Sequence, residues 1–159
     1  RILTFLNPER DPLGAGYQII QSKIAIGSGG LFGKGFLNGS QSYLDYLPEK
    51  HTDFIYTLFS EEFGFFGSFF ILLLYALIIY RIIRIGNITR SNFGKLYCYG
   101  FGTAFFIYVV VNMMMVLGLL PIVGSPLPIM SYGGSSMMAI MFGLGIVMSC
   151  KIYRDVPVN

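Results

Sequence analysis

The stretch FGFFGSFFILLLYALIIY, residues 63–80, contains no charged side chain. An α-helix rises about 1.5 Å per residue, so this stretch nearly crosses a hydrocarbon core about 30 Å thick. Charged residues come directly before it, in YLPEKHTDFIY at 46–56. The pattern predicts a membrane-spanning helix, with ionisable side chains such as Asp53 at the boundary between water and lipid.

The composition of the whole chain also indicates a membrane protein. Hydrophobic residues make up 54% and charged residues 12%, whereas soluble domains carry about 25% charged residues. The Lys and Arg residues are spread along the chain, so we expect no nucleic-acid partner. Cys98 and Cys150 stand alone, without the spacing of a disulfide framework or a metal site. Because the chain begins at Arg1 without a Met, we expect it to be a piece of a longer protein.

Three apolar segments are each long enough to span a bilayer as a helix, at 63–85, 96–120 and 129–150. Basic residues lie around the first connection and after the third segment, so the positive-inside rule places both in the cytoplasm. The predicted architecture is all-α. It has an extracytoplasmic loop at 1–62, a cytoplasmic loop at 86–95, an extracytoplasmic link at 121–128 and a cytoplasmic tail at 151–159.

The first 62 residues contain a glycine-rich part. Residues 17–26 place four Ile among polar residues, which predicts a short helix lying in the membrane interface. The run GSGGLFGKG at 27–35 fails the Walker pattern, because Lys34 is followed by Gly35. Two interpretations remain open: a flexible bend, or a turn whose backbone amides bind a diphosphate.

Polar residues share one face of the helix that begins near Asp53. At 100° per residue this face carries Asp53, Thr57, Ser60, Glu61, Gly64 and Ser68, while Glu62 points the opposite way. An unpaired carboxylate facing acyl chains is costly. We therefore expect the stripe to line a wet cleft that opens outward.

Asp53 has two interpretations. Asp is a favoured N-cap residue, stabilised by the positive end of the helix dipole. Alternatively, it is a reactive carboxylate beside the cleft. Asp45, Glu49, Asp53 and Glu61 would supply oxygen ligands if a divalent cation, Mg²⁺ or Mn²⁺, binds there. The single His51 has no second His with which to complete a metal site.

The third span begins with PLPIMSYGGSS at 126–136. Its two prolines favour an extended entry, and its small residues favour close packing or contact with a substrate. In the second span, Asn112 lies among Val and Met, which predicts a hydrogen bond between helices.

Several separated motifs resemble one family. GSGGLFGKGFLNGSQSYLDYLPEKHTDFIY at 27–56, SEEFGFFG at 60–67 and PLPIMSYGGSS at 126–136 are similar to the SEDS proteins of shape, elongation, division and sporulation. NPERDPLGAGYQIIQSKIAIGSGG at 7–30, LPIVGSPLPIMSYGG at 120–134 and GIVMS at 145–149 look like the elongation-type members. The resemblance covers nearly the whole chain.

The resemblance implies a fold and an activity. SEDS proteins are polytopic proteins of the bacterial cytoplasmic (inner) membrane with about ten helices, of which these would be the last three plus a large extracytoplasmic loop. They polymerise lipid II into peptidoglycan strands, here during elongation and maintenance of rod shape, beside a class B penicillin-binding protein and other membrane proteins of the elongation complex. Asp53, in the HTDF motif, would be the catalytic general base on the extracytoplasmic side. The expected substrate-binding residues are Asp45, Glu49, His51, Thr52, Lys34, Thr57, Glu61 and Ser131.

Two other functions remain open from sequence. A flippase or transporter for the lipid-linked precursor would use the polar stripe as a path for the headgroup. Its polar features would be expected to continue through the midplane, whereas here only Asn112 lies deep. A non-catalytic membrane scaffold of the elongation machinery is the third function.

Overall fold

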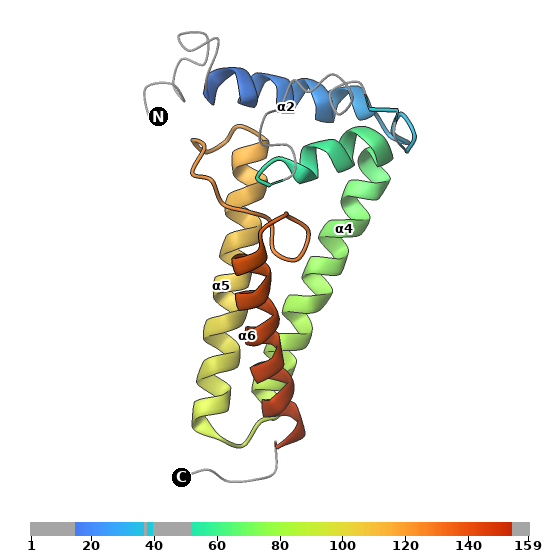
Figure 1. The fold of residues 1–159 in the computed structure, drawn as a ribbon. Helices are drawn as coiled ribbons and strands as arrows, with labels where there is room; N and C mark the ends of the chain where they lie inside the picture. The colour runs from blue at the N-terminus through green and yellow to red at the C-terminus, as the bar shows by residue number, and fades with distance from the viewer. Residues whose placement is uncertain (1–14, 37, 40–51, 154–159) are drawn as a thin grey trace.

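The computed structural model describes residues 15–36, 38–39 and 52–153. Within these ranges the chain forms helices and no strand: α2 (Ala15–Gly29), α4 (Ile55–Ile88), α5 (Asn92–Val116) and α6 (Gly134–Ile152). The last three run alongside one another, while α2 lies across their upper end (Figure 1). The predicted all-α class is confirmed.

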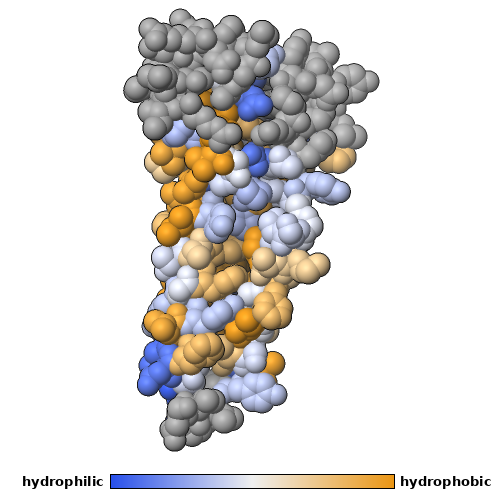
Figure 2. All heavy atoms as spheres, turned by 60° about the vertical axis from the view of Figure 1, so that its left-hand side comes forward, coloured by the Kyte–Doolittle hydropathy of each residue, from blue (hydrophilic) through white to orange (hydrophobic). Residues whose placement is uncertain are grey.

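Three of these helices are long and apolar enough to cross a membrane: α4 with 34 residues, α5 with 25 and α6 with 19. Large hydrophobic side chains are exposed along them, among them Phe69, Leu77 and Phe142. Hydrophobic and weakly polar residues cover the middle of the molecule, and strongly hydrophilic residues gather nearer its ends (Figure 2). This is the distribution expected of a surface that faces lipid.

The third span begins later than the sequence indicated, at Gly134 instead of 129. Pro126 and Pro128 disfavour helical geometry in the residues before them. Ile129 has a φ of 70°, in the left-handed region, which also interrupts a helix. The residues between α5 and α6 therefore form a non-helical link that stays near the upper end of the bundle (Figure 1).

The lower end of the bundle is a tight connection between α4 and α5. Thr89 ends α4 by donating its backbone N–H and its Oγ1 hydroxyl to the carbonyl of Ile85, at 3.1 and 2.8 Å. Ser91 caps α5 by accepting the backbone N–H of Gly94. A buried cluster of Ile82, Cys98 and Val147 then packs all three long helices together at this end.

A kink divides α4 into two helical stretches. Gly64 has φ 66° and ψ −160°, a conformation that is essentially confined to glycine. Residues 55–63 run across the end of the bundle beneath α2, and residues 65–88 descend from the kink (Figure 1). The first helix is therefore not one continuous 3.6-residue repeat.

The backbone groups released by this kink pair with the glycine-rich segment that follows α2. The N–H of Lys34 donates to Glu61 O at 3.1 Å, and that of Gly35 donates to Glu62 O at 3.0 Å. In the other direction, Phe65 N–H donates to Gly30 O at 2.9 Å. We call this pairing of residues 29–35 with 60–66 the glycine interlock.

Glycines are required in the interlock because two backbones meet there. A Cβ on Gly29 would lie 2.2 Å from Ser60 O, one on Gly33 would lie 2.1 Å from Glu62 O, and one on Gly64 would lie 2.3 Å from Gly33 N. These contacts bear on both interpretations of the 27–35 run. It is not a flexible bend, and the amides of Gly33, Lys34 and Gly35 donate to backbone carbonyls and not to a phosphate.

We predict that Gly64→Ala destabilises the protein by about 3 kcal/mol or more, because the new Cβ meets a backbone atom in a conformation that only glycine tolerates. Gly100→Ala is the matched control, since a Cβ there meets nothing within 4 Å. Thermal unfolding in detergent compares the two variants. Equal melting temperatures would show that the interlock does not form.

Candidate functional site

Asp53 lies in a turn immediately before α4 and is 7% exposed. The N-cap residue of α4 is Phe54, which is fully buried and makes no side-chain capping bond. Its carbonyl accepts the N–H of Thr57 at 3.0 Å. The structure therefore does not place Asp53 at the N-cap, and capping does not explain a carboxylate at this buried position.

Two side chains hold the backbone around Asp53. The amide Nδ2 of Asn112, in α5, donates to the carbonyls of Asp53 at 3.0 Å and Ser125 at 2.7 Å. The hydroxyl of Ser131 donates to the carbonyl of Thr52 at 2.6 Å and accepts the N–H of Leu127 at 2.7 Å. We call these four hydrogen bonds the carbonyl clamp. Two consecutive carbonyls, 52 and 53, are thereby fixed to α5 and to the link.

The clamp changes the roles expected for two residues. Asn112 does bond across the bundle, but to carbonyls outside the helices and not to another helix. Ser131 was predicted to bind substrate, yet it is 4% exposed and its hydroxyl bonds to backbone on both sides. Sequence reasoning found the polar Asn in an apolar span but had no signal for its partners.

Lys34 and Glu61, both predicted to bind substrate, contact each other. Lys34 Nζ lies 2.7 Å from Glu61 Oε1, and the Glu61 side chain is fully buried while that of Lys34 is 30% exposed. The pair sits at the glycine interlock, where the Lys34 backbone bonds to the same residue. This geometry favours a structural role, in which Lys34 neutralises a buried carboxylate.

The predicted polar face exists, but its surroundings differ from the expected cleft. Its six residues, Asp53, Thr57, Ser60, Glu61, Gly64 and Ser68, are all buried, and Glu62 is not. Ser60, Gly64 and Ser68 line a cavity of about 280 Å³ whose walls come from α2, α4 and α5. Glu61 faces Lys34. The face therefore turns inward, because the kink brings it against the segment that follows α2.

Of the other predicted site residues, Thr57 and Thr52 are described by the structure and three are not. Thr57 is fully buried, and within the described residues its hydroxyl has no hydrogen-bond partner. Thr52 contributes its carbonyl to the clamp. Asp45, Glu49 and His51 lie outside the described residues, so the proposed cation site stays a prediction. Among the residues described, no three His, Cys, Asp or Glu side chains gather.

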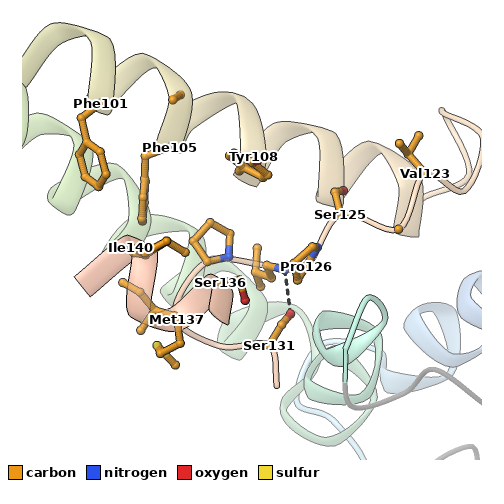
Figure 3. Close-up of a pocket in the computed structure, with 16 residues that line it drawn as sticks. Phe101, Phe105, Tyr108, Val123, Ser125, Pro126, Ser131, Ser136, Met137 and Ile140 are labelled. Atoms are coloured by element: carbon orange, nitrogen blue, oxygen red, sulfur yellow. Dashed lines mark hydrogen bonds between the residues drawn. The ribbon is translucent and has the colours of Figure 1, made fainter. Parts of the chain in front are cut away.

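An apolar groove of about 500 Å³ lies beside the clamp, between α5, the link and α6. Figure 3 shows Phe105 and Tyr108 of α5 facing Met137 and Ile140 of α6, with Ser131 at one edge. Gly124 lines the groove, and a Cβ on it would come within 3.5 Å of Asp53 Oδ2. The carboxylate thus lies next to a wall of the groove.

Sequence comparison identifies similar proteins. The family model described as "Cell cycle protein", for FtsW, RodA and SpoVE, matches residues 1–155. Peptidoglycan glycosyltransferase MrdB of Escherichia coli strain K12 is 53% identical over 154 residues, which is 97% of this chain and 42% of that protein. The chain therefore spans about two fifths of the length of this curated relative.

Two solved structures are similar in fold. One comes from a study titled "Structural coordination of polymerization and crosslinking by a peptidoglycan synthase complex"; it has a TM-score of 0.80 at 33% identity, over 98% of this chain and 42% of that one. The other is a variant of the rod-shape-determining protein RodA of Thermus thermophilus, with a TM-score of 0.66 at 34% identity, over 79% of this chain and 39% of that one.

Proposed function

Because the chain belongs to the FtsW/RodA/SpoVE family, the SEDS proteins, we propose that it carries the catalytic carboxylate of a peptidoglycan glycosyltransferase. The activity is that of the complete polypeptide, of which this chain would be one part. The reaction polymerises lipid II into glycan strands during cell elongation. The observation that carries the proposal is a buried carboxylate, Asp53, whose backbone is clamped at the end of a membrane-spanning bundle.

In the proposed reaction Asp53 is the general base. The 4-hydroxyl of the acceptor GlcNAc attacks the anomeric carbon of the donor MurNAc, and the Asp53 carboxylate takes the hydroxyl proton. The new glycosidic bond forms as the bond to undecaprenyl diphosphate breaks, and the diphosphate leaves with the electron pair. Holding a base in one position reduces the entropy lost on reaching the transition state. The carbonyl clamp would hold Asp53 in one position by fixing the carbonyls of Thr52 and Asp53.

The apolar groove supports a substrate with a lipid tail. A polyprenyl chain gains about 25 cal/mol for each Å² of apolar surface that it buries. The groove is lined mainly by apolar side chains and shares Gly124 with the surroundings of Asp53. A tail in the groove would hold the attached sugar at the level of the carboxylate. Among the described residues, no polar path runs through the midplane of the membrane. This favours an enzyme over a transporter.

We also propose that the Asp53 end faces the extracytoplasmic side. The exposed cations Arg81, Arg84, Arg90 and Lys151 all lie toward the opposite end. In intact cells lacking the native cysteines, a Cys at Asn38 should react with a membrane-impermeant reagent and a Cys at Asn87 should not. Labelling at Asn87 with protection at Asn38 would reverse the orientation.

The partner proposal is a class B penicillin-binding protein, together with other membrane proteins of the elongation complex. The support is the similarity to a chain studied within a peptidoglycan synthase complex. We expect the partner to raise the polymerisation rate of the complete protein and to supply cross-linking.

The catalytic assignment predicts that Asp53→Asn lowers glycan synthesis from labelled lipid II by about 10²- to 10⁴-fold, because an amide cannot accept the proton. The Asn side chain is of nearly the same size and leaves the two clamped carbonyls in place. Insertion and lipid II binding should therefore be normal, and adding the penicillin-binding protein should not rescue the variant. Glycan length on gels measures the product.

Glu62→Gln is the matched control, since it removes one nearby carboxylate, from the first part of α4, that lies on the helix face opposite the buried polar residues. It should polymerise at close to the normal rate. Near-normal synthesis by a well-folded Asp53→Asn protein would contradict the general-base role.

A further inference from the structure

Three cationic side chains line one pocket at the end of the bundle opposite Asp53. Arg81 and Arg84 come from α4 and Lys151 comes from the last turn of α6. The pocket has a volume of about 420 Å³, and its remaining wall is formed by Ile85, Ile88, Thr89 and Met148. Its lining therefore includes three positive charges and no acidic side chain.

The charges of this pocket are not neutralised within residues 52–153. The ion pair found among the described residues is Lys34–Glu61, at the other end of the molecule. Thr89 donates its hydroxyl to the carbonyl of Ile85, one of the helix-end carbonyls near the pocket. That bond leaves this carbonyl less able to repel an anion. A pocket of this kind attracts an anionic group.

An apolar groove continues from the same pocket. It has a volume of about 480 Å³ and runs between α4 and α6 along Leu74, Leu77, Ile78, Ile82, Leu144 and Val147. Arg81, Ile85 and Met148 line both spaces, so pocket and groove share a wall. From Leu74 to Arg81 the helix rises about 10 Å, at about 1.5 Å per residue. The positively charged pocket is thus continuous with the apolar groove.

We propose that the basic pocket and the adjoining groove together bind one anionic glycerophospholipid. Its phosphate would lie against Arg84 and Lys151, and an acyl chain would run along the groove between α4 and α6. Basic pockets between transmembrane helices suit anionic headgroups, and Lys or Arg near a membrane surface contributes about 1 kcal/mol each to such binding. Free phosphate would leave the groove empty, and a zwitterionic lipid would bring its own cation into the pocket.

The test counts lipids on the complete protein. Purified in neutral detergent, it would be titrated with phosphatidylglycerol or phosphatidylcholine of the same acyl chains, and bound lipid would be measured by native mass spectrometry. Arg84→Gln with Lys151→Gln should weaken phosphatidylglycerol binding about 10- to 30-fold. Arg90→Gln with Lys95→Gln is the matched control, because it removes the same two charge types from outside the pocket and should bind normally.

Arg84 and Lys151 are exposed, so we expect the Gln variants to fold. Melting temperatures equal to that of the unaltered protein, measured without added lipid, would establish that they do. Four results would overturn the proposal: equal retention of phosphatidylcholine, equal loss of binding in both double variants, displacement of the lipid by excess inorganic phosphate, or no bound phosphatidylglycerol on the unaltered protein. The last would mean that another segment of the complete protein covers the groove.

Discussion

Backbone groups that leave helical geometry near a bilayer must find partners inside the protein, because hydrocarbon offers them none. This constraint explains the two least regular parts of the structure. Where Gly64 interrupts α4, the freed groups bond to residues 30–35 in the glycine interlock. Before α4 and before α6 the chain is not helical, and side chains supply the partners of its carbonyls. Asn112 and Ser131 donate to the carbonyls of Thr52, Asp53 and Ser125, and Tyr75 donates to the carbonyl of Pro128.

The same bonds that satisfy the backbone also define the site. The hydroxyl of Ser22 in α2 donates to Val116 O at the end of α5, so α2 joins the network at the upper end of the bundle. Asp53 lies within this network, between helices and link, and it borders an apolar groove. The opposite end is built differently, from a tight turn and an apolar cluster, and the side chains of Arg81, Arg84, Arg90 and Lys151 are exposed there. The end that carries Asp53 is therefore suited to holding a catalytic group in one position, and the opposite end is suited to binding charged headgroups.

The spans, the all-α class and the grouping of polar residues on one helix face were predictable, because apolar length and 3.6-residue spacing are local properties of the sequence. The kink was not predicted: Gly64 sits in an apolar run where glycine is common, and its partner Gly33 is far away in sequence. The helical phase counted from Asp53 placed Glu61 and Gly64 on one face correctly, but it could not show that this face turns toward residues 29–35. Nor could the sequence pair Asn112 with the Asp53 carbonyl, since the two residues are 59 positions apart and meet only once α4 has packed against α5.

The rate of lipid II polymerisation by an Asn112→Leu variant tests most directly whether the carbonyl clamp positions Asp53 for catalysis. Leu has a similar size but no donor, so the variant loses the bonds to the carbonyls of Asp53 and Ser125 and keeps the Asp53 side chain. A small displacement of a catalytic group costs about 10²-fold in rate. We predict that the folded variant binds lipid II with nearly unchanged affinity and polymerises it at a rate lower by about that factor, while Val110→Leu, nearby on the same helix, polymerises normally. Unchanged turnover in a folded Asn112→Leu protein would contradict the claim that the clamp positions Asp53 for catalysis.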